Sequence, residues 1–308
     1  MTAEAHSDWT TAAFELPPVA EAVGPFAGPA MLRTWWDARG TGDLLLIEGP
    51  DALMTMTQTG NTIRLLGEAD LFDYHSPLGP GVGKLVATWA ATLPPGISLD
   101  FDSLPAEAAD LLMAGLSEAG LAPLAAVHQS AAVLNLPGNF ESYLAGLDKK
   151  QRHETRRKTR RFADVLGTPR LLRAHGPEAL SRFAAMHRLA SGDKGTFMDS
   201  AMERLFGGLH TNAGAIIDFL HGDGDEPVAA AFGFEDTSAY YLYNSAYAPE
   251  AGAASPGIVL VAELIRQAAE RSLGRFDFLK GDEVYKYRLG AVARPLWRIT
   301  ATTGAHSP

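Results

Sequence analysis

The chain has 308 residues, a hydrophobic fraction of 46% and a formal net charge of −10. This length fits one very large domain or two domains of about 150 residues. The absence of cysteine excludes disulfides, thiolate catalysis and cysteine-based metal sites, and the nine histidines lack a metal-binding spacing, so we expect no metal. The sequence shows neither a signal peptide nor an apolar run of the roughly 18 to 20 residues that cross a bilayer, so we expect a cytoplasmic protein.

The charge is unevenly distributed along the chain. Residues 149–161, KKQRHETRRKTRR, hold eight Lys or Arg and one acid, Glu154, for a local formal charge of +7. Because the total is −10, the remainder carries −17. This balance argues against nonspecific binding of polyanions over the whole surface, and it makes the basic segment the clearest outlier.

In the first half of the chain, hydrophobic periodicity and turn residues predict alternating helices and strands. Gly49-Pro50 and Gly60-Asn61 separate three short strands of a meander. In chain order we predict a helix at 28–39, strands at 43–48, 51–57 and 61–67, a helix at 82–92, a strand at 97–101, a helix at 105–119 and strands within 123–136.

The second half repeats this order. We predict helices at 140–166, 177–190 and 199–209, strands at 215–220, 228–235 and 239–247, a long helix after Ser255, a strand at 275–279, a helical turn at 283–289 and a strand at 294–300. Ser255 is a plausible N-cap, Pro256 a first helical residue and Gly274 a stop.

This order predicts an α/β fold with mixed sheets, built from two similar halves at residues 1–138 and 139–308. A three-stranded meander followed by a crossover helix and one more strand places two parallel strands side by side. The junction between meander and helix then brings the free N–H groups of a helix N-terminus beside those strands, which is a natural site for an anion.

The basic segment has two interpretations. At helical spacing, Lys149, Arg152, His153, Arg156 and Arg160 share one face, while an apolar set lies roughly opposite: Leu144, Leu147, Thr155, Phe162 and Leu166. The helix is either a solvated or internally docked charged face, or a site for phosphates. The abundance of arginine favours the second, because arginine captures phosphate or carboxylate bidentately.

A second unusual segment is FDFLKGDEVYKYRLGA at 276–291. It places charged and phenolic groups directly after a buried-looking strand, where α/β folds carry chemistry: Lys280, Asp282, Glu283, Tyr285, Lys286, Tyr287 and Arg288. Glu283 or Asp282 could be a general base, and Tyr285 or Tyr287 a general acid. The alternative is a capped turn with internal salt bridges.

Three loops have weaker signals. The glycine-rich runs at 79–84 and 252–257 could present backbone N–H groups to a pyrophosphate, but neither matches a nucleotide-binding fingerprint, and an ordinary turn is the alternative. The loop at 70–76 gathers Asp73, Tyr74 and His75, which form either a hydrogen-bonded turn or part of a site.

Taken together, RHETRRKTRR and FDFLKGDEVYKYRLGA resemble the FemAB-like branch of the GNAT acyltransferase superfamily, including CelD-type acetyltransferases. The resemblance is strongest over 140–295. Leu147 to Arg161 matches an arginine-rich helix of that family, and Gly281 to Arg288 matches its GDExYKxR-like run. The usual GNAT phosphate loop is replaced by EAGAASPG at 250–257.

The resemblance implies tandem GNAT-like halves and transfer of an acyl group from acyl-CoA, such as acetyl-CoA, to an amine or hydroxyl of a small or carrier-bound acceptor. Glu283, Tyr285 and Asp282 are the expected catalytic residues, and Ser255 and Gly257 the expected cofactor-binding residues. The expected substrate-binding residues are Arg152, His153, Arg156, Arg160, Asp73, Tyr74, His75, Lys280, Lys286 and Arg288. The missing Cys and GxSxG elbow agree with direct attack on a bound thioester.

Two other functions stay open. A peptide ligase that uses aminoacyl-tRNA, as in the FemAB family, would need a longer basic surface than this acidic chain shows. A non-catalytic module could bind nucleic acid or a protein through the basic helix, but no aromatic residues alternate with its arginines to stack on bases. Apart from tRNA, we expect no nucleic-acid partner.

Overall fold

A computed structural model describes residues 4–6, 9, 11–190 and 193–304 and divides the chain into two compact units. Unit 1 comprises residues 1–131 and 294–308, and unit 2 comprises residues 132–293. Strands β6 (Leu124–Asn135) and β12 (Val292–Thr302) each contain one of these boundaries. The last strand, which the sequence places in the second half, therefore belongs mostly to unit 1.

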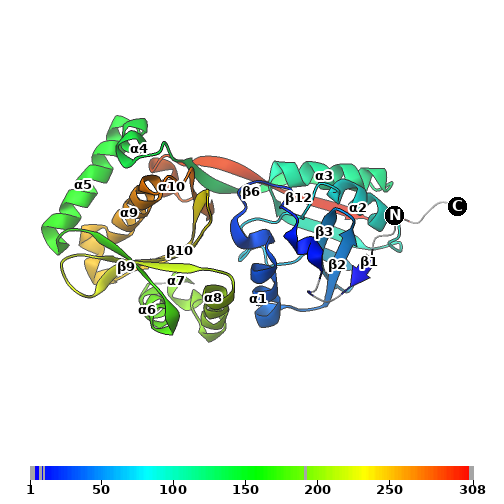
Figure 1. The fold of residues 1–308 in the computed structure, drawn as a ribbon, viewed down its shortest axis with the longest axis horizontal. Helices are drawn as coiled ribbons and strands as arrows, with labels where there is room; N and C mark the ends of the chain where they lie inside the picture. The colour runs from blue at the N-terminus through cyan, green and yellow to red at the C-terminus, as the bar shows by residue number, and fades with distance from the viewer. Residues whose placement is uncertain (1–3, 7–8, 10, 191–192, 305–308) are drawn as a thin grey trace. The chain divides into compact units, whose positions relative to one another are not determined.

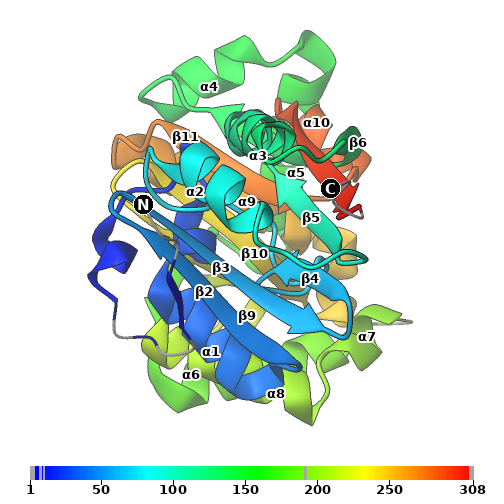
Figure 2. The ribbon, with the colours of Figure 1, turned by 90° about the vertical axis from the view of Figure 1, so that its right-hand side faces the viewer.

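Unit 1 contains a meander, one parallel strand and helices. Its elements are β1 (Glu4–His6), η1 (Ala12–Glu15), η2 (Gly24–Ala27), α1 (Pro29–Arg39), β2 (Asp43–Gly49), β3 (Ala52–Thr59), β4 (Thr62–Leu65), α2 (Val82–Ala90), β5 (Ser98–Leu104) and α3 (Ala106–Glu118). The strand order is β1-β2-β3-β4-β5-β12. Strands β2, β3 and β4 are antiparallel neighbours (Figure 2), whereas β5 runs parallel to β4 and antiparallel to β12.

Unit 2 repeats this plan with more helices. Its elements are α4 (Phe140–Gly146), α5 (Lys149–Leu166), β7 (Arg170–Ala174), α6 (Gly176–Arg188), α7 (Asp193–Phe197), α8 (Ser200–Asn212), β8 (Ile216–His221), β9 (Pro227–Glu235), β10 (Ala239–Tyr247), η3 (Pro249–Ala254), α9 (Pro256–Glu270), β11 (Arg275–Lys280) and α10 (Val284–Arg288). The strand order is β6-β11-β10-β9-β8-β7. Helix α9 covers one face of this sheet, and α6, with α8 packed on it, covers the other (Figure 1).

Both units place a parallel strand pair at the predicted position. In unit 1 the pairing of β4 with β5 runs from Thr62 and Ser98 to Arg64 and Asp100. In unit 2 the pairing of β10 with β11 runs from Ala239–Arg275 to Tyr241–Asp277 and stops there, although both strands continue. The predicted α/β class with mixed sheets is confirmed.

A left-handed residue lies near the carboxyl end of each parallel strand. Ser103 in β5 has φ +59° and Leu279 in β11 has φ +60°, and both side chains are buried. Non-glycine residues adopt this backbone rarely and at an energetic cost, and such strain collects at functional sites. The repeated order therefore extends to a repeated backbone distortion beside the place where each parallel pair ends.

Three local details differ from the sequence-based expectations. The helix predicted at 140–166 is broken, because Asp148 is an N-cap that accepts a hydrogen bond from the Gln151 N–H (2.9 Å) and starts α5 anew. Ser255 precedes α9 in a left-handed conformation without a side-chain cap. Strand β7 was not predicted because its burial pattern lacks strict alternation.

Within the part of the chain that the structure describes, no helix has both the length and the apolar composition required to span a bilayer.

Candidate functional site

A cavity of about 200 Å³ opens in unit 2 beside the basic helix. Helix α5 supplies five of its lining residues, the first turn of α9 supplies one, and α10 with the residue after it supplies three: Lys150, Gln151, Glu154, Thr155, Lys158, Ile258, Tyr285, Arg288 and Leu289. Three of these side chains are cationic and one is a carboxylate. The lining is therefore suited to a ligand that carries negative charge.

Helix α5 is held against the unit by a narrow buried stripe. Thr155 and Phe162 are buried, and Phe162 belongs to the core cluster that also contains residues of α9. The Arg152 guanidinium donates to the backbone carbonyls of Ala145 (3.0 Å) and Leu147 (3.3 Å), which ties the end of α4 to the start of α5. The stripe predicted as apolar is the buried one, and a cationic flank lies on each side of it.

The side of α5 that faces the cavity carries a row of charged residues at helical spacing. Lys150, Glu154 and Lys158 follow one another at intervals of four residues, which places them on one side of the helix. The Glu154 carboxylate accepts two hydrogen bonds from the Arg157 guanidinium (3.0 and 2.9 Å). This hydrogen bonding lowers the pKa of Glu154, so the carboxylate stays ionised and is a weak base.

The predicted substrate-binding residues of α5 lie on the other flank. His153, Arg156 and Arg160 are exposed and do not line the cavity. Arg156 pairs with the Glu141 carboxylate at 3.1 Å, and Arg152 is engaged with backbone carbonyls. Periodicity identified the buried stripe but not which of the two neighbouring flanks faces α9 and α10.

The run at 281–288 forms a turn that Lys286 closes. Its side chain is buried, and its Nζ donates to the Lys280 carbonyl at 2.6 Å and pairs with the Glu283 carboxylate at 3.0 Å. Gly281 has φ +114°, and an added Cβ there would collide with the Glu283 carboxylate. Lys286 and Glu283 therefore hold the end of β11 in place, and neither lines the cavity.

The remaining predicted residues of this turn divide into two groups. Tyr285 and Arg288 line the cavity, whereas Lys280 and Asp282 do not. Asp282 lies 3.4 Å from the Tyr287 hydroxyl, which donates to it. Burial raises the pKa of Tyr285 to about 12, and the Glu283 charge adds to the effect, so the phenol stays protonated and can donate a hydrogen bond.

The predicted cofactor-binding residues flank the cavity lining at the start of α9. Ile258 lines the cavity, while Ser255 and Gly257 do not. The Ser255 carbonyl accepts the N–H groups of Ile258 (3.1 Å) and Val259 (3.2 Å). Gly257 lies beside the Tyr247 ring. A Cβ added to Gly257 would be 3.5 Å from a carbon of that ring.

The triplet Asp73, Tyr74 and His75 belongs to unit 1. Tyr74 is fully buried, with the Arg294 guanidinium 5.0 Å from the centre of its ring. His75 is buried beside Asp102. These residues therefore do not contribute to the cavity beside α5.

The family of unit 2 follows from a sequence match. Residues 149–287 match the family described as acetyltransferase (GNAT) domain. Unit 2 contains a GNAT acetyltransferase domain. The matched segment begins at the first residue of α5 and ends within α10, so this GNAT domain includes every residue of the cavity lining except Arg288 and Leu289.

Solved structures resemble the chain over nearly its whole length. A conserved protein of unknown function from Bacteroides thetaiotaomicron is 14% identical, with a TM-score of 0.64 and coverage of 94% of this chain and 95% of that one. FemX is 10% identical, with a TM-score of 0.60 and coverage of 93% of both chains. L-PGS from Bacillus licheniformis is 13% identical, with a TM-score of 0.55 and coverage of 94% and 95%.

At these identities the likeness establishes a shared fold. The helices and strands of this chain, its GNAT domain included, are arranged as in FemX. No curated protein matches the sequence.

Proposed function

We propose that the GNAT domain transfers an acyl group from an acyl-CoA to an amine or hydroxyl acceptor, and that the cavity beside α5 holds the anionic part of the donor. The observation that carries this proposal is the lining itself. Lys150, Lys158 and Arg288 surround about 200 Å³ of space together with the protonated Tyr285 hydroxyl.

The cations divide the work of binding phosphate groups. Arg288 presents a planar fork that can hold two oxygens of one phosphate, whereas Lys150 and Lys158 act as point charges on either side of Glu154. Because the Glu154 carboxylate is paired with Arg157, it does not neutralise Lys150 and Lys158, and the field on the cavity side of α5 stays positive. The volume is small compared with a whole CoA, so we expect only part of the donor to enter.

Tyr285 is the neutral hydrogen-bond donor of the cavity. Because its raised pKa of about 12 keeps the phenol protonated, the hydroxyl can donate a hydrogen bond to an anionic oxygen that the three cations hold. Glu283 and Asp282 lie outside the cavity lining, and we assign no proton step to them.

The test compares two cationic residues of one helix. Lys158 lines the cavity, whereas Arg160 lies on the outer flank, which is the exposed side of α5 that also carries His153 and Arg156. We expect calorimetric titration with CoA and acetyl-CoA to show binding that Lys158→Ala weakens roughly tenfold or more, as for a lost hydrogen bond to a charged group. Arg160→Ala should change it by less than about twofold. Equal losses in the two variants, or no binding of either compound to the wild type, would refute the proposal.

A second candidate donor is an aminoacyl-tRNA. Two observations favour it: the FemX-like fold of the whole chain and the outer flank of α5, where His153, Arg156 and Arg160 are exposed. This candidate predicts salt-dependent binding of tRNA that Arg156→Ala and Arg160→Ala weaken, without binding of CoA. Gel-shift titration at two salt concentrations separates the two donors.

A further inference from the structure

Helix α5 carries a second basic surface, on its outer flank. The row consists of exposed residues at intervals of four, three and four: Lys149, His153, Arg156 and Arg160. This spacing keeps them on one side of the helix, and at 1.5 Å per residue the row is about 16 Å long. Among the described residues, a carboxylate pairs with Arg156, but none pairs with Lys149 or Arg160. The row therefore offers positive charge to a partner.

The charges around this row favour a protein partner over a nucleic acid. Two exposed carboxylates lie beside the cations, Glu141 on α4 and Asp164 on α5. A nucleic-acid backbone is charged at every phosphate and would meet these carboxylates, whereas a protein can place its own carboxylates opposite the cations alone. Outside residues 149–161 the chain carries −17, which repels an extended polyanion. The outer flank therefore fits a compact acidic protein surface.

The cavity on the neighbouring side of α5 matches one end of a thioester donor. Besides its three cations, the lining has the apolar side chains of Ile258 and Leu289 and the amide of Gln151, which has no side-chain hydrogen bond among the described residues. Phosphopantetheine, the arm that bears the thiol of CoA, combines a phosphate, a branched dimethyl carbon and amides. The lining offers a contact of the right kind to each of these groups, and its volume leaves the adenosine of CoA outside.

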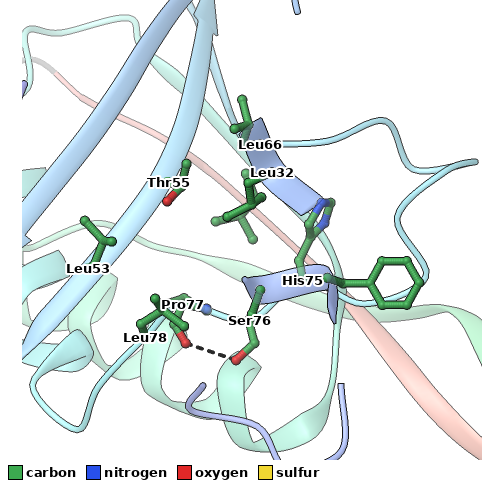
Figure 3. Close-up of a pocket in the computed structure, with 11 residues that line it drawn as sticks. Leu32, Leu53, Thr55, Leu66, His75, Ser76, Pro77 and Leu78 are labelled. Carbon is green, nitrogen blue, oxygen red and sulfur yellow. Dashed lines mark hydrogen bonds between the residues drawn. The ribbon is translucent and has the colours of Figure 1, made fainter. Parts of the chain in front are cut away.

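The cavity of unit 1 offers no such match. It has about 20 Å³ of space, and its walls are mostly apolar (Figure 3). The Ser76 hydroxyl is already engaged, because it donates to the Pro77 carbonyl at 3.0 Å, as the dashed line marks. None of the residues that line this cavity is a lysine or arginine. A phosphate-bearing arm therefore fits the cavity beside α5 and not this one.

One partner can contact both surfaces of α5. Lys158 lines the cavity, and Arg156 and Arg160 of the outer flank come two residues before and after it. A helix with its side chains is only about 10–12 Å across, so the two surfaces are close. When a phosphate and an acidic surface belong to the same molecule, binding of one raises the effective concentration of the other.

We propose that unit 2 takes its acyl group from a phosphopantetheine thioester that is carried by a small acidic protein. Carboxylates of the carrier contact the outer flank of α5, and the phosphate of its arm binds between Lys150, Lys158 and Arg288 in the cavity. This inference rests on the proposed acyl transfer and names the form in which the donor arrives: a protein surface takes the place of the adenosine of CoA.

The experiment titrates the full chain with four probes at about 0.15 M salt, where weak surface attraction is screened. The probes are an acidic acyl carrier protein with its phosphopantetheine arm (holo), the same protein without the arm (apo), CoA and bulk tRNA. We expect calorimetry to show that the holo carrier binds at least roughly tenfold tighter than either the apo carrier or CoA, because only the holo form contacts both surfaces.

Three variants assign the contacts. Arg160→Glu should weaken binding of the holo carrier roughly tenfold or more and change binding of CoA by less than about twofold, because it sets like charges against each other on the flank only. Lys158→Ala should weaken both ligands. Arg204→Glu is the matched control, since Arg204 is an exposed arginine of α8 and undergoes the same change of charge. It should leave both affinities within about twofold.

The outcomes separate this inference from the proposed function. If CoA binds and the holo carrier binds no tighter, the inference is overturned and the donor cavity stands. Equal weakening by Arg160→Glu and Arg204→Glu would overturn it as well, because the carrier would then respond to overall charge. Binding of tRNA without binding of the carrier would assign the flank to a nucleic acid. If neither CoA nor the carrier binds, both proposals fail.

Discussion

Units 1 and 2 follow the same order of elements but carry different side chains near the carboxyl ends of their parallel strands. In each unit a left-handed residue, Ser103 or Leu279, lies near the carboxyl end of the parallel strand. Beyond it, unit 1 has a histidine fixed by a carboxylate, and unit 2 has a turn closed by Lys286. The sheet order decides where a site is built, while the side chains at that place decide what it binds.

The cavities of the two units also differ in size and charge. The cavity of unit 2 has about 200 Å³ and three cations, whereas the cavity of unit 1 has about 20 Å³ and mostly apolar walls. Repetition of a fold therefore does not imply repetition of a ligand.

The largest effect should come from the cores beneath the parallel strands. Phe101 in unit 1 and Phe276 in unit 2 are both fully buried. Truncation of either to Ala should reduce the free energy of unfolding by roughly 3–5 kcal/mol. Hydrogen exchange followed by mass spectrometry should show lost protection mainly in the unit that carries the change. Equal loss in both units would mean that the chain unfolds as one cooperative structure.

Next in size is the turn that positions Tyr285. Gly281→Ala forces a side chain into a left-handed backbone against the Glu283 carboxylate, so we expect a loss of about 1–3 kcal/mol and weaker CoA binding. Gly252→Ala is the matched control, because an added Cβ there meets nothing within 4 Å. Thermal unfolding and calorimetric titration measure both variants. A Gly281→Ala protein that binds CoA normally would separate the turn from the cavity.

The raised pKa of Tyr285 predicts a dependence of stability on alkaline pH. Below pH 10 both folded and unfolded states keep the phenolic proton, so nothing changes. Between about pH 10 and 12 the unfolded state loses it first, and stability falls by up to about 1.4 kcal/mol per pH unit. Tyr285→Phe should reduce this slope in urea unfolding at pH 9, 10 and 11, and an unchanged slope would contradict the assigned burial.

The smallest effect belongs to the outer flank of α5. The Arg156–Glu141 pair is exposed on both sides, with 53% and 74% of the side chains accessible. Arg156→Ala should cost about 0.2–1 kcal/mol in urea unfolding and leave CoA binding unchanged. A loss above roughly 2 kcal/mol would give this flank a structural role that its contacts do not indicate.

Most helices and strands could be predicted because their apolar residues recur at a clear period. The meander at β8, β9 and β10 and the long helix α9 lie within a few residues of their predicted bounds. Two features could not be predicted in this way. Strand β7 has no strict alternation, and the pairing of β12 with β5 joins residues about 200 positions apart, which no local pattern reveals.

The candidate site was predicted only in part. Tyr285 and Arg288 were expected from their place after a buried strand, and they line the cavity. Lys150, Glu154 and Lys158 were not predicted, because the expected binding face was chosen by its arginines, which lie on the other side of α5. These three residues follow one another at intervals of four, next to the buried Thr155. A charged row at the edge of the buried side of a helix lies close to the neighbouring helices, so this spacing could have predicted that they line the cavity.

The order in which the strands are made has a consequence for synthesis on the ribosome. Strand β5 finds its partner β12 only after the whole of unit 2 has been translated. Until then the nascent unit 1 exposes the backbone groups of β5 along that edge, and such an open edge invites pairing with other chains. Unit 2 therefore leaves the ribosome while unit 1 still waits for its last strand, so loss of residues 292–302 would harm the part of the protein that is made first.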